Sequence, residues 1–418
     1  MSGTPIKILH TADCHLDSPL KSLALRDEGL RDQVQSATRR AFARIIDTAL
    51  SEQVSALLIA GDLFDGAQRS AKTAAFVIEQ FDRLANAEIP VFYIKGNHDA
   101  ENPITGEISL PLNVHVFDGR GGKVQLGTHN VWIHGVSFAK QHAPESLLGK
   151  FGAPVPDAVN IAMLHTSLGG AAGHDNYAPC SVADLMAMGF DYWALGHIHK
   201  RQIHAHAPWV VMPGIPQGRD IGETGPKSAT LLTIQNGEIA VAEVSTSSVE
   251  FIPHTIDITD IDTPDALRAS IREALDAVAE SLHSDSGIVR LTLTGKTALR
   301  WSILRDLETW QETATYIAES TGSLRIEKLR VDLKDADEDP ASQHASATYE
   351  LTQLMAQIRK ETAFQSEFRA EIEAVLNDLP ANLRAGLMKD SSAAQTLAER
   401  LAEQGEDQIL AQMKTATS

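Results

Sequence analysis

The chain has 418 residues, 43% of them hydrophobic and 22% charged, which indicates a folded protein of more than one domain. Its two cysteines, Cys14 and Cys180, exclude a disulfide framework and lack the spacing of a zinc site. Without a signal-peptide pattern or an apolar run of about 18 residues, we expect a soluble, cytoplasmic protein with no membrane partner. The net charge of −19 argues against bulk electrostatic binding of nucleic acid, although the larger share of this charge lies after residue 250.

The first hundred residues predict alternating strands and helices. Apolar runs at 6–9, 55–60 and 91–94 predict strands buried on both faces. Helical patterns at about 30–53 and 71–87 lie between these runs. This order implies parallel strands, because strands that point the same way need a long connection. Further strands are predicted at 131–134, 158–164, 191–195, 209–212 and 229–233.

Three domains are expected along the chain. The first covers residues 1–248, and a small α+β domain covers 249–336. Within the second domain, the pattern predicts a strand near 251, a helix at 264–282, a strand at 289–293, a helix at 302–319 and a strand at 324–333. Residues 337–418 form a third, helical C-terminal region that is rich in Ala, Glu, Leu and Gln and broken at Leu379-Pro380.

Polar residues that can bind metals follow five of the predicted strands. They are Asp13, His15, Asp62, Asn97, His98, His165, His197 and His199. In open α/β folds, functional sites form at the carboxyl ends of the strands. If these segments are extended, alternate side chains share a face, so Asp13 with His15 and His197 with His199 point into one space. Mixed carboxylate, amide and imidazole ligands suit manganese, iron or zinc, and their number suits two ions that share a bridging carboxylate.

Each of these motifs alone has a simpler interpretation. The tetrapeptide at 96–99 could be a turn, and lone histidines such as His10 and His134 are typical of core or solvated positions. The DxH and GD patterns are weak, whereas GNHD and GHxH are moderately specific. Their joint occurrence, each after a strand, favours a metal site in which His98 holds or donates a proton and Asp99 fixes its tautomer.

The complete set resembles that of the calcineurin-like metallophosphoesterase superfamily. The set comprises Asp13-x-His15, Gly61-Asp62, Gly96-Asn97-His98-Asp99, His165 and Gly196-His197-x-His199. Segments 10–19, 194–200, 213–219 and 223–227 resemble the DNA-repair exonuclease branch, which includes SbcD and YhaO-type proteins. The resemblance covers about the first 240 residues and the rest only in layout. It implies an α/β fold in which a two-sheet sandwich is flanked by helices, followed by a small α+β capping domain and a helical C-terminal region.

The resemblance also assigns roles to individual residues. It implies two divalent metal ions per chain, with manganese expected. One ion would be held by Asp13, His15, Asp62 and His199, and the other by Asp62, Asn97, His165 and His197. His98 takes the role of the catalytic histidine and Asp99 that of its orienting partner. Cys14 stands where an apolar residue is expected, and a small buried thiol fits there.

The implied function is a metal-dependent DNA exonuclease of DNA repair, with endonuclease activity on single strands as a further expectation. Lys200 and Arg219 could contact DNA phosphates or be solvated, and His174, near Tyr177 on a Gly-rich loop, could touch substrate or serve only the loop. The implied partners are DNA, a coiled-coil ABC-type ATPase subunit and often a second copy of the chain. Two alternatives stay open: a small-molecule phosphodiesterase or phosphatase, and a DNA-binding scaffold subunit.

Overall fold

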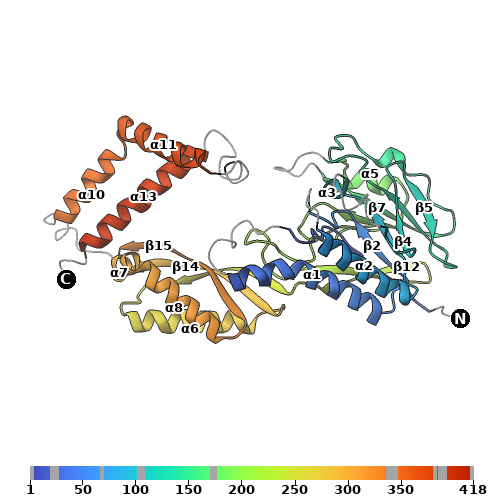
Figure 1. Ribbon diagram of the computed structural model, residues 1–418, viewed down its shortest axis with the longest axis horizontal. Coiled ribbons are helices and arrows are strands. Elements are labelled where there is room, and N and C mark those ends of the chain that lie inside the picture. Colours follow the sequence, from blue (N-terminus) through green and yellow to red (C-terminus); the bar gives the residue numbers. More distant parts are fainter. Residues whose placement is uncertain are drawn as a thin grey trace. The chain divides into compact units, whose positions relative to one another are not determined.

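The computed structural model (Figure 1) describes most of the chain in two compact units. The described residues are 4–18, 28–65, 70–100, 109–169, 177–335, 347–379, 384 and 393–414, without the side chains of 28–35, 347–349 and 414. The first unit comprises Met1–Pro253 and Ser281–Val289, and the second comprises His254–Glu280 and Arg290–Ser418. All structural statements below concern these described residues.

The first unit contains two six-stranded sheets. The first has the order β12-β11-β1-β2-β3-β4, from β1 (Ile6–Thr11), β2 (Ala56–Ala60), β3 (Val91–Ile94), β4 (Val114–Val116), β11 (Ser228–Gln235) and β12 (Glu238–Ser245). The second has the order β5-β6-β7-β8-β10-β9, from β5 (Gly122–Gln125), β6 (Val131–Val136), β7 (Val159–His165), β8 (Tyr192–Gly196), β9 (Gln202–His206) and β10 (Trp209–Met212). β1, β2 and β3 are parallel, as predicted, and so are β7 and β8.

The alternation of side chains along β2 shows how the layers pack. Leu57 faces a buried cluster with Phe42 of α1 (Glu28–Ser51) and Phe81 of α2 (Ala71–Asn86). Leu58 points to the opposite face, where it packs with Ile133 of the second sheet. Complete burial of each such side chain contributes about 1.5–3 kcal/mol. The predicted two-sheet sandwich flanked by helices is therefore confirmed, with α1 and α2 side by side in Figure 1.

The region after the sandwich has the predicted order of elements. β13 (Val249–Asp257), β14 (Ser286–Thr297) and β15 (Leu324–Asp335) form a three-stranded sheet. Helix α6 (Pro264–Glu280) connects the first two strands, while α7 (Arg300–Arg305) and α8 (Leu307–Ser320) precede the third. The sequence predicted one helix in place of α7 and α8, but the backbone leaves the helical conformation at Asp306, with φ −104° and ψ 31°. Helices α10 (Ala347–Ile358), α11 (Thr362–Asn377) and α13 (Ala393–Lys414) confirm the helical C-terminal region.

Some elements were not predicted from the sequence. β12 is an edge strand whose residues are mostly exposed or half-buried, so it lacks the apolar run that marked the other strands. Helix α5 (Val182–Ala187) packs Leu185 against Trp193 on the outer face of the second sheet. None of the helices in the described part of the chain is long and apolar enough to cross a membrane.

Candidate metal centre

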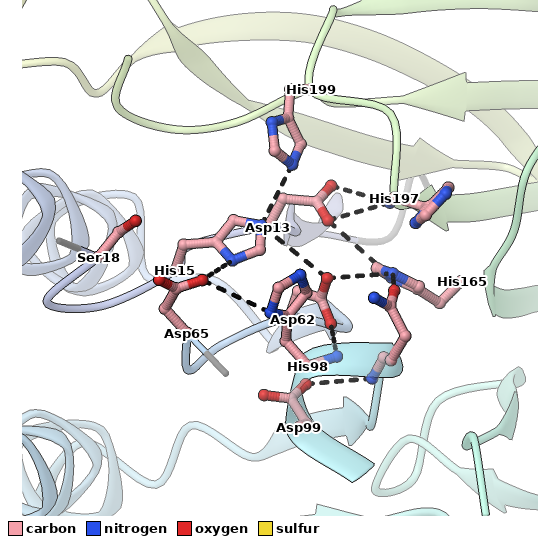
Figure 2. Close-up of polar contacts among 12 residues, drawn as sticks. Asp13, His15, Ser18, Asp62, Asp65, His98, Asp99, His165, His197 and His199 are labelled. Carbon is pink, nitrogen blue, oxygen red and sulfur yellow. Dashed lines mark hydrogen bonds and ion pairs between the residues drawn. The ribbon is translucent and has the colours of Figure 1, made fainter. Parts of the chain in front are cut away.

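The carboxyl ends of β1, β2, β3, β7 and β8 bring the predicted site residues together (Figure 2). Asp13, Asp62 and His165 are almost completely buried, at 2% exposure or less. Each of these three also belongs to a group of ligand atoms that lie within 4.8 Å of one another. The position of a site at this edge follows from the parallel direction of the strands in each sheet.

The first group of ligands contains two imidazoles that face each other. The Nε2 atoms of His15 and His199 are 3.1 Å apart, and Asp13 completes their group. Asp65 Oδ1 lies 3.3 Å from Nδ1 of His15, and Glu223 Oε1 lies 2.7 Å from Nδ1 of His199. A carboxylate beside Nδ1 favours the proton on that nitrogen, so each Nε2 presents a lone pair to the other. This arrangement fits a cation that both nitrogens ligate.

The second group lies around His165. Its Nε2 is 3.4 Å from Asp62 Oδ2 and 3.1 Å from Asn97 Oδ1. Its Nδ1 lies 2.9 Å from the carbonyl oxygen of Ala60, to which it donates, so Nε2 faces the site. The ring of His197 lies beside it, with centroids 5.1 Å apart, and the backbone N–H of His197 donates to the Asp13 carboxylate.

Asp62 stands between the two groups. Its Oδ2 is 3.4 Å from Nε2 of His165 and 3.9 Å from Nε2 of His15. Its Oδ1 accepts a hydrogen bond of 2.9 Å from the backbone N–H of His98. A carboxylate in this position has the geometry that a bridging ligand needs.

The buried charges favour the replacement of a proton by a cation. Burial raises the pKa of Asp62, but the neighbouring His165 and His15 lower it well below its ordinary value. Burial alone would lower the pKa of His165, but the Asp62 carboxylate has the opposite effect, and the pKa is raised to about 9. Without metal, a proton on His165 therefore offsets the buried negative charge, and a divalent ion would displace that proton.

The ligand-bearing segments are not extended, contrary to the sequence-based expectation. The left-handed backbone angles are φ 53° at Asp13, 41° at His15, 52° at Asp62 and 103° at His197. The side chains still converge, because the backbone N–H groups of Asp13 and His15 bind the carbonyls of Gly61 and Asp62 at 2.9 and 3.0 Å. Cys14 points away from the ligands into the apolar cluster beneath α1 and α2, as expected.

Glycines in the motifs leave room for the ligands. A Cβ on Gly61 would lie 2.3 Å from Nδ1 of His165, and a Cβ on Gly96 would lie 2.2 Å from Oδ1 of Asp62. A Cβ on Gly196 would lie 2.0 Å from a carbonyl oxygen of β2. Real Cβ atoms do not approach so closely, so any other residue would displace part of the site.

His98 lies at the open side of the centre. It belongs to the short helix α3 (Asn97–Ala100), and its side chain is 36% exposed. Its ring is 4.9 Å from that of His15, and its Nδ1 lies 3.5 Å from Asp65 Oδ1. Burial raises the pKa of Asp65, but His15 and His98 lower it to about 2, so Asp65 is a carboxylate at neutral pH.

Asp99 belongs to the same helix, and its side chain is fully buried. Its carboxylate accepts hydrogen bonds of 3.0 to 3.3 Å from the backbone N–H groups of Leu63, Phe64 and Gly96. Burial and the charge of Asp62 raise its pKa to about 6. These contacts tie the turn after β2 to the turn after β3. The orienting role for the His98 ring stays a prediction.

A groove with a volume of about 1000 Å³ opens beside the centre. Its walls include His98 and His199 together with three cationic side chains, Lys200, Arg201 and Lys227. Arg201 lies 3.3 Å from Glu243, and Lys227 donates to a backbone carbonyl at 2.6 Å. The side chain of Lys200 is exposed and makes no hydrogen bond or ion pair with the described residues.

Two other predicted substrate contacts have different outcomes. Arg219 binds Glu223, with Nη2 2.8 Å from Oε1, and does not line the groove. Its contact with DNA therefore stays a prediction. His174 lies outside the described residues. Glu223 received no role as a partner of the ligands in the sequence analysis, although it stands in one of the segments that carried the resemblance.

Two family descriptions match the chain. They are "Calcineurin-like phosphoesterase" over residues 6–201 and "Metallophosphoesterase YhaO, middle domain" over residues 251–334. Metallophosphoesterase YhaO of Bacillus subtilis is 35% identical over 303 residues, which are 71% of this chain and 74% of YhaO. DNA double-strand break repair protein Mre11 of Sulfolobus acidocaldarius is 23% identical over 350 residues, or 79% and 86% of the two chains. A dimetal phosphatase structure from Danio rerio covers 58% of this chain at 11% identity, but its TM-score of 0.36 supports no argument.

The fold, the centre and these matches define a metallophosphoesterase, and the chain belongs to the calcineurin-like phosphoesterase family. Within that family, the chain is similar to YhaO and to the DNA double-strand break repair proteins Mre11. The family hydrolyses phosphoesters with a dinuclear divalent metal centre, and the ligand groups of this chain fit such a centre.

Proposed function

We propose that this protein is a manganese-dependent DNA nuclease of DNA repair, chiefly an exonuclease and also an endonuclease on single strands. The groove that joins the centre to Lys200, Arg201 and Lys227 carries the proposal. A polyanionic strand needs cations beside the bond that is cut, and a small phosphoester does not. The name of the Mre11 relatives, DNA double-strand break repair protein, supports the same substrate.

The proposed ligands divide into two sets that share Asp62. One ion would be held by Asp13, His15, Asp62 and His199, and the other by Asp62, Asn97, His165 and His197. The convergence of Nε2 of His15 and His199 at 3.1 Å supports the first set. The contacts of His165 Nε2 with Asp62 and Asn97 support the second. Mixed oxygen and imidazole donors suit manganese.

The chain's own residues then perform the remaining chemistry. The bound ions supply charge stabilisation at the phosphate and a water of lowered pKa. His98, at the open side, donates a proton to the leaving oxygen when the P–O bond breaks. The Asp65 carboxylate, 3.5 Å from Nδ1, orients the His98 ring toward the substrate. Lys200 holds the phosphate next to the one that is cut.

The test uses the full chain stripped of metal. It is incubated with end-labelled linear DNA, closed circular single-stranded DNA and bis-p-nitrophenyl phosphate, with and without added manganese. His98→Ala runs in parallel, and calorimetry checks that this variant still binds metal. Degradation of linear DNA that needs manganese and falls at least about 100-fold in His98→Ala supports the nuclease.

The other outcomes separate the alternatives. Cleavage of the closed circle establishes endonuclease activity. Fast turnover of the small ester with intact DNA identifies a small-molecule phosphodiesterase and overturns the nuclease proposal. Bound metal with no turnover of either substrate identifies a binding subunit or a subunit that needs its partner, and addition of that partner distinguishes the two.

The family resemblance also supports a partner and a role for the middle region. We propose that residues 249–336 cap bound DNA and that a coiled-coil ABC-type ATPase docks on α10. Leu354, one of the apolar residues of this helix, is 52% exposed. Co-expression of that ATPase with the wild type and with Leu354→Glu tests the docking face, because a complex that survives the charge overturns it. Size-exclusion chromatography of the co-expressed proteins detects the complex and also shows whether the chain dimerises.

A further inference from the structure

Glu223 lines the groove beside the centre and makes a dense set of contacts with His199 and Arg219. Its Oε1 lies 2.7 Å from Nδ1 of His199 and accepts a hydrogen bond of 2.8 Å from Nη2 of Arg219. The same Nη2 lies 3.1 Å from Nδ1 of His199, so the carboxylate and the guanidinium both face this ring nitrogen. Its Oε2 accepts the backbone N–H of Arg219 at 2.8 Å. The side chain is only 15% exposed.

We propose that Glu223 and Arg219 form a clamp that positions His199 as a metal ligand. Glu223 holds the ring proton on Nδ1, and this leaves the Nε2 lone pair directed at the site. Glu223 contacts neither the ion nor the substrate in this role, so it is a positioning residue. The inference rests on the ligand role proposed above for His199, and it does not depend on DNA as the substrate.

Arg219 keeps the carboxylate behind the ring. A free carboxylate so near a divalent ion would compete for coordination, but both Glu223 oxygens are occupied by the guanidinium and backbone of Arg219. Charge-assisted contacts of this kind are about twice as strong as neutral ones. The positive charge of Arg219 also balances Glu223, so the clamp adds no net charge to the centre.

The backbone of the same segment holds His199 from a second direction. The N–H of Ile215 donates to the carbonyl oxygen of His199 at 3.0 Å. Gly214, with φ 75°, permits this approach, because a Cβ there would lie 2.8 Å from the same oxygen. Segment 213–223 therefore fixes both the backbone and the ring of one ligand.

The test is metal binding by Glu223→Gln in the full chain. The substitution keeps the side-chain volume but places an NH₂ group among N–H donors, so the clamp loses an acceptor. Titration of the metal-stripped protein with manganese should show two ions in the wild type. In Glu223→Gln, we expect one ion to bind about 10–100-fold more weakly and the other to be unchanged. Electron paramagnetic resonance should show loss of the spin-coupled manganese pair at limiting metal.

Glu327→Gln is the matched control. Glu327 is also held by an arginine, since Arg290 Nε lies 2.6 Å from Oε2, and it is 9% exposed. It belongs to the second unit, so its substitution tests the loss of a glutamate–arginine pair without the His199 contact. We expect this variant to bind both ions as the wild type does.

Each outcome decides one of the two ideas. If the wild type binds two ions and Glu223→Gln binds both with unchanged affinity, the clamp is overturned. If the wild type binds no manganese, the proposed metal-dependent function fails instead. If circular dichroism shows that Glu223→Gln does not fold, Arg219→Lys is tested in its place. This variant keeps the positive charge but loses the guanidinium that binds Glu223. Unchanged binding of both ions by Arg219→Lys then overturns the clamp.

Discussion

The Nε2 atoms of His15 and His199 lie 3.1 Å apart, although the residues are 184 positions apart in the chain. Each Nδ1 faces a carboxylate, so the two lone pairs oppose each other until a cation lies between them. We therefore predict that manganese at 100 times its dissociation constant stabilises the fold by about 2.7 kcal/mol for each ion bound. Thermal unfolding with manganese and with chelator measures this difference. Equal melting temperatures in both conditions would contradict a metal centre at these residues.

Asp65→Asn should impair both catalysis and metal binding. Asp65 Oδ1 is 3.3 Å from Nδ1 of His15 and 3.5 Å from Nδ1 of His98, so one carboxylate orients a ligand and the proposed acid. We expect kcat on linear DNA, whose alkoxide leaving group needs the proton from His98, to fall about 10–100-fold. Asp47→Asn, at an exposed pair with Arg83, is the control. Wild-type kcat in Asp65→Asn would show that Asp65 does not orient His98.

Gly96→Ala should inactivate the protein without removal of a ligand. Its Cβ would lie 2.2 Å from Oδ1 of Asp62, so the carboxylate proposed as the bridging ligand must move or the backbone must shift. We expect a loss of about 1–3 kcal/mol in stability and of the second bound ion. Gly152→Ala, which meets nothing within 4 Å, is the control. Urea unfolding and manganese titration measure both effects, and full metal binding by Gly96→Ala would refute the steric argument.

Lys200→Ala should weaken DNA binding and its dependence on salt. Lys200 follows a proposed ligand in sequence and lines the groove. Loss of one phosphate contact should reduce the slope of log K against log salt by about 0.7–0.9. Fluorescence anisotropy with labelled DNA at several salt concentrations measures the slope. Lys140→Ala, at an exposed lysine outside the groove, should leave it unchanged. An identical slope in both variants would show that DNA does not contact Lys200.

His10→Gln should flatten the loss of stability in acid. His10 is buried against the Tyr192 hydroxyl and the Leu195 carbonyl, and burial lowers its pKa from 6.5 to about 3. Between these values the unfolded chain binds the extra proton, so the free energy of unfolding falls as the pH falls below 6.5. The slope is at most about 1.4 kcal/mol per pH unit. Urea unfolding of both proteins between pH 5 and 7 measures it, and parallel slopes would exclude His10 as the cause.

Local patterns predicted much of the fold and the set of site residues. The continuous apolar runs at β1, β2 and β3 require parallel, doubly buried strands, and parallel strands bring their carboxyl ends together. Asp13 and Asp62 could therefore be placed in one site from the sequence alone. The same logic could not find β12, because an exposed edge strand has little apolar pattern.

The supporting contacts were beyond the reach of periodicity. Glu223 touches His199 only because a segment with irregular backbone returns to the strand end, and no hydrophobic repeat encodes that path. The left-handed backbone at Asp13 and His15 was also unexpected, since such angles are uncommon for residues other than glycine. The proposed ligands converge because of backbone hydrogen bonds between the two turns, and not because alternate side chains of an extended strand share a face.

The close packing of Gly61, Gly96 and Gly196 against the centre has a genetic consequence. Every missense change of a glycine codon adds at least a Cβ, so any such change at these positions presses on a ligand or on the strand beside it. Single substitutions should therefore inactivate the enzyme at more positions than the proposed metal ligands alone. A screen for loss-of-function alleles should return glycine substitutions alongside those of histidine and aspartate.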